Sequence, residues 1–183
     1  MLTVLLGGAR SGKSSLALEA ARSLGVPVTF VATAQALDDE FAERIERHRA
    51  QRPSDWLTIE EPIDLAGVFA NIPPSTAVVC DCLTLWVNNL MESGINGAEI
   101  VERAHRLAEF AGRRSGATFV VSNEVGSGIV PADAGSRHYR DLLGAVNATF
   151  AGLADEAFLV VAGQVLRLDS PGPIVGRLGN ATS

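Results

Sequence analysis

One stretch near the start of the chain combines glycines, a lysine and a hydroxyl group at a spacing suited to binding phosphate. Residues 7–14 read Gly-Gly-Ala-Arg-Ser-Gly-Lys-Ser and fit the pattern G-x-x-x-x-G-K-S/T. An apolar strand is expected just before this motif and a helix directly after it, so backbone N–H groups and the positive end of the helix can surround phosphate oxygens. The motif predicts a triphosphate site in which Lys13, the single lysine of the chain, contacts the β- and γ-phosphates and Ser14 binds Mg²⁺. The residues assigned to this phosphate loop are Gly7, Gly8, Ala9, Arg10, Ser11, Gly12, Lys13 and Ser14.

Two acidic residues follow apolar runs that are expected to be strands. Asp81 ends the run Val-Val-Cys-Asp at residues 78–81, which is where a carboxylate can hold Mg²⁺ directly or through water. The alternative is that Asp81 caps the helix that follows. Glu124 comes just after the run at 118–122, either at a ligand-binding strand edge or as a solvated loop acid.

The segment at residues 44–53 places four arginines around a single histidine, His48. On a helix, Phe41, Ile45 and His48 fall within roughly a 60° arc, which allows His48 to be a core-facing histidine. A second interpretation is a covalent phospho- or nucleotidyl-histidine, because neighbouring guanidinium groups would neutralise phosphates that otherwise repel a nucleophile. A third is an arginine-rich lid over a phosphoryl donor.

The hydrophobic pattern along the chain predicts strands that alternate with helices. Strands are expected at residues 3–6, 28–32, 77–82 and 118–122, with a final hairpin from 157–161 and 165–168. Helices are expected at 13–24, from Asp38 towards Arg52, and at 65–70, 83–91, 98–114 and 137–153. This order is typical of an α/β fold with a mainly parallel sheet, flanked by helices and ending in an antiparallel hairpin. We expect one domain over residues 1–169 and a loose tail, rich in glycine, proline and serine, over residues 170–183.

Composition and charge exclude several classes of protein. The 183 residues suffice for one domain with a sizeable core, since 47% are hydrophobic. A net charge of -6 gives no bulk attraction to nucleic acid or to an anionic membrane, so no nucleic-acid partner is expected. The opening apolar run, Met1 to Leu6, is shorter than a signal-peptide core, and no apolar stretch approaches the length of a membrane span, so we expect no membrane span and a cytoplasmic protein. Cys80 and Cys82 are expected to be buried free thiols.

Several of these motifs together resemble one family, the bifunctional adenosylcobinamide kinase/adenosylcobinamide-phosphate guanylyltransferases of cobalamin assembly. The likeness runs from about residue 2 to about residue 168. It is carried by the phosphate loop, Val31-Ala32-Thr33-Ala34-Gln35, Asp38-Asp39-Glu40, residues 44–53, Asp81-Cys82-Leu83-Thr84, and residues 122–126, 128–131 and 137–141.

The resemblance implies a RecA-like P-loop domain that forms a homotrimer and uses one nucleotide site for two reactions. In the first, the terminal phosphate of ATP or GTP passes to the hydroxyl of the aminopropanol arm of adenosylcobinamide. In the second, a histidine attacks the α-phosphate of GTP, pyrophosphate leaves, and GMP passes to adenosylcobinamide phosphate. His48 matches that histidine, and the residue before it is Arg47, where some members have a second histidine.

The same matching implies a set of contacts to nucleotide and Mg²⁺. Lys13 and His48 are the expected catalytic residues, and Ser14 and Asp81 are the expected metal ligands. Glu60 is matched to a nucleotide contact, although Glu61 would serve a slightly shifted alignment. Beyond the phosphate loop, the expected nucleotide contacts are Ala32, Thr33, Ala34, Arg49, Ala50, Gln51, Arg52, Glu60 and Asp81.

Three other functions remain as alternatives. A simple P-loop kinase would use the arginines as a lid and would never form a covalent bond at His48. A guanine-nucleotide switch is disfavoured because the chain's only lysine, Lys13, leaves none for an Asn-Lys-x-Asp motif. A DNA-dependent motor is disfavoured by the negative charge. We expect the corrin ring to contact the glycine-rich segment between Gly126 and Arg140.

Overall fold

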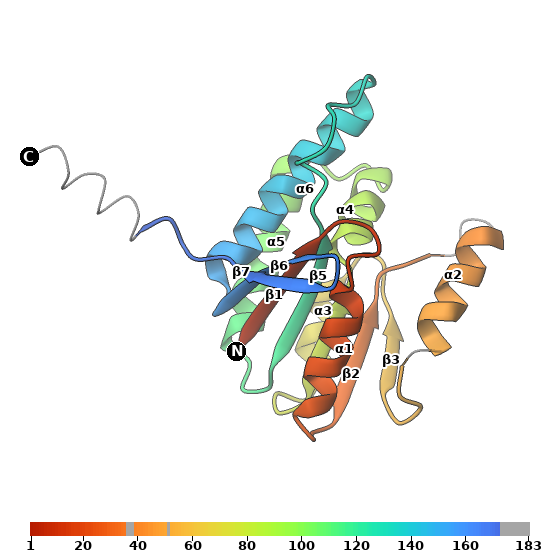
Figure 1. The fold of residues 1–183 in the computed structure, drawn as a ribbon, viewed down its shortest axis with the longest axis vertical. Coiled ribbons are helices and arrows are strands. Elements are labelled where there is room, and N and C mark those ends of the chain that lie inside the picture. The colour runs from red at the N-terminus through yellow and green to blue at the C-terminus, as the bar shows by residue number, and fades with distance from the viewer. Residues whose placement is uncertain (36–38, 51, 173–183) are drawn as a thin grey trace, which may run out of the picture.

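A computed structural model describes residues 1–35, 39–50 and 52–172, and in this part of the chain seven strands form a single sheet (Figure 1). The strand order is β3-β2-β4-β5-β1-β6-β7. The strands are β1 (Leu2–Gly7), β2 (Val28–Ala32), β3 (Leu57–Glu60), β4 (Ala77–Asp81), β5 (Thr118–Asn123), β6 (Glu156–Val161) and β7 (Gln164–Arg167). The helices are α1 (Lys13–Ser23), α2 (Asp39–Ala50), α3 (Leu65–Asn71), α4 (Leu83–Glu92), α5 (Gly97–Arg113) and α6 (Ala134–Leu153).

The sheet is parallel except for its last pair. β1 pairs in parallel with both β5 and β6, and β4 pairs in parallel with β2 and β5. Only β6 and β7 pair antiparallel within the described residues, as a hairpin. Because parallel strands need crossover connections, the carboxyl ends of β1, β2, β4 and β5 meet at one edge of the sheet. The predicted α/β class and terminal hairpin are confirmed.

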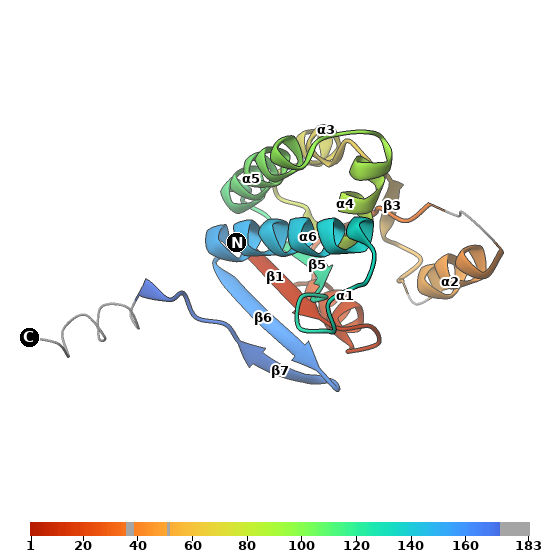
Figure 2. The ribbon, with the colours of Figure 1, turned by 90° about the horizontal axis from the view of Figure 1, so that it is seen from above.

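Helices cover both faces of the sheet (Figure 2). On one face α1 packs Ala17, Leu18 and Ala21 against alternate residues of the central strands, such as Phe30 and Val79. On the other face α3, α4, α5 and α6 bury a larger cluster that includes Trp86, Leu107 and Phe150. A strand that is buried on both faces has a continuous apolar sequence, so β1, β2, β4 and β5 could be predicted.

Two elements differ from the sequence prediction. β3 was not predicted, because it is a four-residue edge strand whose Leu57 is 60% exposed, so its apolar signal is weak. α6 begins at Ala134, three residues before the predicted start at Arg137. Asp133 caps this helix by accepting a hydrogen bond from the Ser136 backbone N–H at 2.7 Å, so the first turn is stabilised by a cap that hydrophobic periodicity does not reveal.

Some predictions fall on residues outside the described part of the chain. Asp38, the expected start of the second helix, and Gln51, an expected nucleotide contact, are among them. Most of the expected tail, residues 173–183, also lies outside it, so the boundary at residue 169 stays a prediction. No helix in the described ranges is long and apolar enough to cross a membrane.

Candidate active site

A cavity of about 180 Å³ opens at the carboxyl edge of the parallel strands. It brings together residues predicted from five separate stretches of sequence. Among the predicted site residues, those lining the cavity are Lys13, Ser14, Ala32, Ala34, His48, Arg52, Glu60 and Asp81. Ligands of open α/β sheets bind at this edge. The remaining predicted contacts that the structure describes, Gly7 to Gly12, Thr33, Arg49 and Ala50, are not in the lining.

The phosphate loop joins β1 to α1 and has the backbone geometry that its glycines allow. Gly12 has φ of 101°, a left-handed conformation that permits α1 to begin at Lys13. Gly7 has no room for a side chain, because a Cβ there would collide with the carbonyl oxygen of Val160 on β6. The turn between β6 and β7 supports the loop through a 2.9 Å hydrogen bond from the Gly163 N–H to the Ser11 carbonyl. The phosphate loop is therefore held at its start by β6 and at Ser11 by the turn between β6 and β7.

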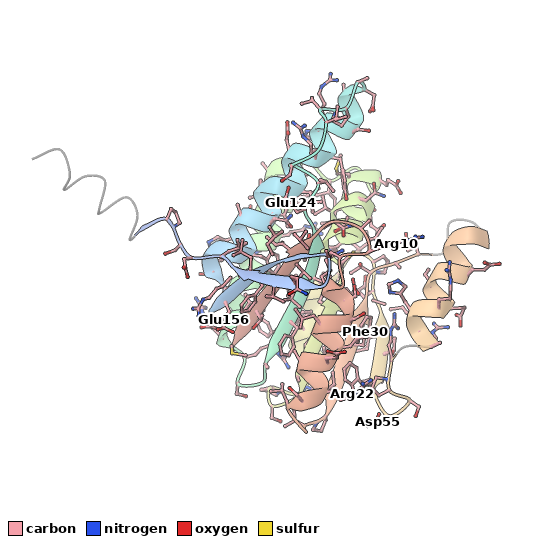
Figure 3. The ribbon with its side chains drawn as sticks, viewed as in Figure 1. Arg10, Arg22, Phe30, Asp55, Glu124 and Glu156 are labelled. Carbon is pink, nitrogen blue, oxygen red and sulfur yellow. The ribbon has the colours of Figure 1, made fainter. Side chains whose placement is uncertain are left out.

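Lys13 is 8% exposed, and its Nζ donates to the Gly8 carbonyl at 3.0 Å. This hydrogen bond turns the ammonium group of Lys13 back towards the phosphate loop, which precedes Lys13 in the sequence. Arg10, labelled in Figure 3, is exposed at the tip of the loop and has φ of 56°. The loop thus presents one buried cation beneath it and one exposed cation at its tip.

The residues present suit Mg²⁺. Ser14 and Asp81 line the same cavity and offer a hydroxyl and a carboxylate oxygen, and Mg²⁺ prefers oxygen ligands. No group of three or more His, Cys, Asp or Glu side chains in the described residues is arranged to hold a metal. A site with one carboxylate, one hydroxyl and substrate phosphates is the usual protein environment of Mg²⁺, so this donor set fits the ion.

Helix α2 supplies the histidine of the cavity. His48 and Ile45 both line it, His48 is half-buried, and the apolar Ile45 on the same helix face belongs to neither core cluster. The interpretation of His48 as a core-facing histidine is therefore wrong. The side chain of Phe41, which would share this helix face, lies outside what the structure describes.

Two arginines near His48 have different partners. The Arg52 guanidinium stacks over the Phe30 ring with its carbon 3.7 Å from the ring centre. Burial lowers the pKa of Arg52, and nearby Asp81 opposes this effect. Arg49 forms ion pairs with Glu46, at 2.6 Å, and with Glu60. The second pair links α2 to the end of β3, so two residues assigned separately to nucleotide binding contact each other.

Thr33, an expected nucleotide contact, has a structural role in the strand ends beneath the cavity. Its hydroxyl donates to the Cys82 carbonyl at 2.7 Å and accepts from the Cys82 N–H at 2.9 Å, and the residue is fully buried. The Asn89 side chain holds the Thr33 carbonyl at 2.9 Å. Thr33 thus ties the ends of β2 and β4 together beneath the cavity.

Six residues of the lining escaped sequence reasoning: Phe30, Ile45, Cys82, Thr84, Leu85 and Asn123. Phe30 and Leu85 belong to or pack against the core cluster beneath α1, and their place in the cavity lining becomes visible only in the folded chain. Asn123 could have been predicted by the criterion used for Asp81, because Asn123 is also a polar residue at the end of a buried strand.

Of the cysteines and the other histidines, Cys82 alone is in the cavity lining. Cys80 and Cys82 are buried free thiols, as predicted, and burial raises the pKa of Cys82 to about 11. His105 is a surface residue with a side chain that is 54% exposed. His138 is exposed on α6 and is not in the lining. Glu124 is also outside the lining, and its carboxylate accepts the Gly126 N–H at 2.6 Å.

Residues 3–168 match the sequence model of a family described as cobinamide kinase / cobinamide phosphate guanyltransferase. The chain belongs to this family. It is therefore an enzyme of a bifunctional kinase and nucleotidyltransferase family, as the sequence motifs predicted.

Proteins of known role are similar over most of their length. The chain is 40% identical to the bifunctional adenosylcobalamin biosynthesis protein CobP of Pseudomonas aeruginosa, with 89% of this chain and 94% of the relative covered. It is also 40% identical to the bifunctional adenosylcobalamin biosynthesis proteins CobU of Escherichia coli and Salmonella typhimurium, with 89% of this chain and 97% of each relative covered.

Solved structures support the fold. A protein of Pyrococcus horikoshii OT3 aligns with a TM-score of 0.55 at 10% identity, over 92% of this chain and 86% of that one. The ATP synthase subunit NeqB of Nanoarcheaum equitans aligns with a TM-score of 0.52 at 12% identity, over 86% of this chain and 44% of that one. These likenesses, with the strand order, confirm the predicted fold of a mainly parallel sheet flanked by helices.

Proposed function

We propose that this chain phosphorylates adenosylcobinamide with ATP or GTP and then transfers GMP from GTP to adenosylcobinamide phosphate through a guanylyl-histidine at His48. The observation that carries the proposal is that Lys13, His48 and Asp81 line one cavity. The product is adenosylcobinamide-GDP. Family membership supports the two activities, and the shared cavity supports one site for both.

In the kinase step the cobinamide hydroxyl oxygen bonds to the terminal phosphorus of the nucleotide. The bond from that phosphorus to the β–γ bridging oxygen breaks, the nucleoside diphosphate leaves with the electron pair, and the hydroxyl proton passes to water. Lys13 and the backbone N–H groups of the phosphate loop stabilise the charge on the phosphate oxygens. Mg²⁺, held by Ser14 and Asp81, would neutralise further charge on the phosphates.

In the guanylyl step a ring nitrogen of His48 bonds to the α-phosphorus of GTP, and pyrophosphate leaves with the electron pair of the α–β bridging oxygen. A phosphate oxygen of adenosylcobinamide phosphate then attacks the same phosphorus, and the electron pair of the P–N bond returns to His48. The covalent route divides one difficult transfer into two easier ones. Arg52, in the same lining, offers a positive charge to the α-phosphate region.

Other expected contacts and properties form part of the proposal. Arg49 and Glu60, which pair with each other, would hold the nucleotide side of α2 against β3. Ala32, Ala34, Ala50 and Gln51 would add contacts to the nucleotide. We further propose that the chain works as a homotrimer in the cytoplasm, as the family resemblance implies.

The two activities can be separated by substitution at His48. We expect His48→Ala to abolish transfer of label from α-³²P-GTP to adenosylcobinamide phosphate while phosphorylation of adenosylcobinamide by γ-labelled nucleotide continues. His105→Ala, on the exposed face of α5, is the matched control and retains both activities. Equal loss of both activities in His48→Ala would contradict the covalent role and leave His48 a structural part of the cavity.

A further inference from the structure

Asn123 occupies a distinctive position in the strand order. It ends β5, and β5 lies between β1, which leads into the phosphate loop, and β4, which ends at Asp81. In the parallel register Asn123 is paired with Gly7, the first residue of the phosphate loop. Its side chain lines the cavity together with Lys13, Ser14 and Asp81. The end of β5 therefore lies between the group that binds phosphate and the expected metal carboxylate.

The backbone around Asn123 is held by three hydrogen bonds that do not use its amide side chain. Its N–H donates to the Thr84 hydroxyl at 2.7 Å, and its carbonyl accepts from the Asn147 side chain at 2.9 Å. The next residue, Glu124, donates its N–H to the Gly7 carbonyl at 3.1 Å. The Cα of Asn123 is thus fixed relative to the phosphate loop, to α4 and to α6.

The side-chain amide of Asn123 has no hydrogen-bond partner among the residues that the structure describes. An asparagine kept at a strand end for structure would use its amide to cap a turn or a helix, as Asn96 does at the start of α5. At Asn123 the strand end is already held by the backbone hydrogen bonds, so the amide is not needed for that purpose. Asn123 therefore offers the cavity a neutral amide donor on a backbone that is held in place, and preorganised donors of this kind stabilise charge developing on a substrate.

The lining divides into two sides. His48, Ile45 and Arg52 come from α2 and the residues that follow it, and Glu60 comes from β3, beyond β2 at one edge of the sheet. Asn123 comes from β5, on the other side of β4 and next to the strand that carries the phosphate loop. A lysine in this motif contacts the β- and γ-phosphates. The terminal phosphate is therefore expected on the Asn123 side, and the α-phosphate on the His48 side.

We infer that the Nδ2 group of Asn123 donates a hydrogen bond to the terminal phosphate while it is transferred to the hydroxyl of the cobinamide substrate, and that it has no part in guanylylation of His48. This inference rests on the proposed function. In the step that Asn123 assists, the hydroxyl oxygen bonds to the terminal phosphorus, the bond to the β–γ bridging oxygen breaks, the nucleoside diphosphate leaves with the electron pair, and the hydroxyl proton passes to water.

The test compares both half-reactions in the full-length protein carrying Asn123→Ala. We expect kcat for phosphorylation of adenosylcobinamide by γ-³²P-ATP or γ-³²P-GTP to fall by about 100-fold, the usual effect of losing one donor to a transition state. The KM for nucleotide and the rate of labelling by α-³²P-GTP should stay within about twofold. Asn88→Ala is the matched control, because Asn88 lies on α4 and its amide donates to Glu92 of the same helix.

A second variant keeps the inference testable if the alanine variant folds poorly. Asn123→Asp preserves the shape of the side chain, loses the donor and adds a negative charge beside phosphate, so its kinase activity should fall at least as far. An unchanged kcat in both variants, or equal loss of phosphorylation and labelling, would overturn the inference while leaving the proposed function intact. A wild-type protein that phosphorylates no adenosylcobinamide would overturn both.

Discussion

Arg114 links the helical layer to the sheet, and its removal should be costly. The residue caps α5, is 7% exposed, and lies against the end of α3 and the turn that leads to β4. One terminal nitrogen donates to the Phe69 and Ile72 carbonyls, both at 3.1 Å. The other donates to the Pro73 and Thr76 carbonyls, both at 3.0 Å. Burial lowers the pKa of Arg114, but an arginine stays charged at neutral pH.

The size of the effect follows from those four contacts. Each carbonyl that loses its donor in Arg114→Met costs about 1 kcal/mol net, since water reaches some of them and the guanidinium no longer has to be desolvated. The sum predicts a loss of about 3–5 kcal/mol in the free energy of unfolding. For a chain of this size, that loss lowers the melting temperature by roughly 6–20 °C.

The assay is urea and thermal unfolding followed by far-ultraviolet circular dichroism, with the adjacent arginine as control. Arg113 is 78% exposed and contacts Glu109 at 3.4 Å, so Arg113→Met should change stability by no more than about 0.5 kcal/mol. A similar small change in both variants would refute the reasoning, because it would mean that the four carbonyls find water as easily as they find Arg114.

Three further predictions concern the active site and its surroundings. Lys13→Ala should lower both transfer activities by more than about 100-fold, because both use the same phosphate loop; an intact kinase would contradict the single site. Phe30→Leu removes the ring beneath Arg52 and should raise the KM for nucleotide by about 2- to 10-fold. The control Phe110→Leu, on α5, should leave this KM unchanged. Equal KM values in the two variants would show that stacking on Phe30 does not position Arg52 for nucleotide binding. Tyr139 is the only tyrosine of the chain, and burial raises its pKa to about 12. After a jump to pH 11, the absorbance of the phenolate should therefore show that about one tenth of Tyr139 is ionised in the folded protein. In urea, where the pKa returns to about 10, about nine tenths should be ionised. Because the folded chain keeps that proton, the free energy of unfolding should fall as pH rises above 10; native titration near pH 10 would contradict the burial.

The parts of the structure with local causes were predictable from the sequence. The phosphate loop needs particular glycines and a lysine within eight residues, and β1, β2, β4 and β5 are apolar because both faces are covered. The burial of Cys80 and Cys82 follows from the same rule. His48 was singled out by its arginine neighbours, although its core-facing alternative could be discarded only once the cavity was known.

The features that depend on distant contacts were not predictable. β3 exists because β2 offers it a parallel partner, not because four residues have strong strand propensity. The hydroxyl of Thr33 hydrogen-bonds both backbone groups of Cys82, 49 residues away, and no local pattern indicates this link. Asn123 gains its position from β1 and β4, and neither strand is near it in sequence.

The most direct test of the central claim is incubation of the protein with Mg²⁺ and α-³²P-GTP, followed by denaturation, treatment with acid or alkali, and mapping of the labelled peptide. The proposed function predicts one label on His48, stable to alkali and labile to acid as expected for a phosphorus–nitrogen bond, and absent from His48→Ala. Absence of label from a protein that still binds the nucleotide would contradict the guanylyl-histidine and leave a simple kinase.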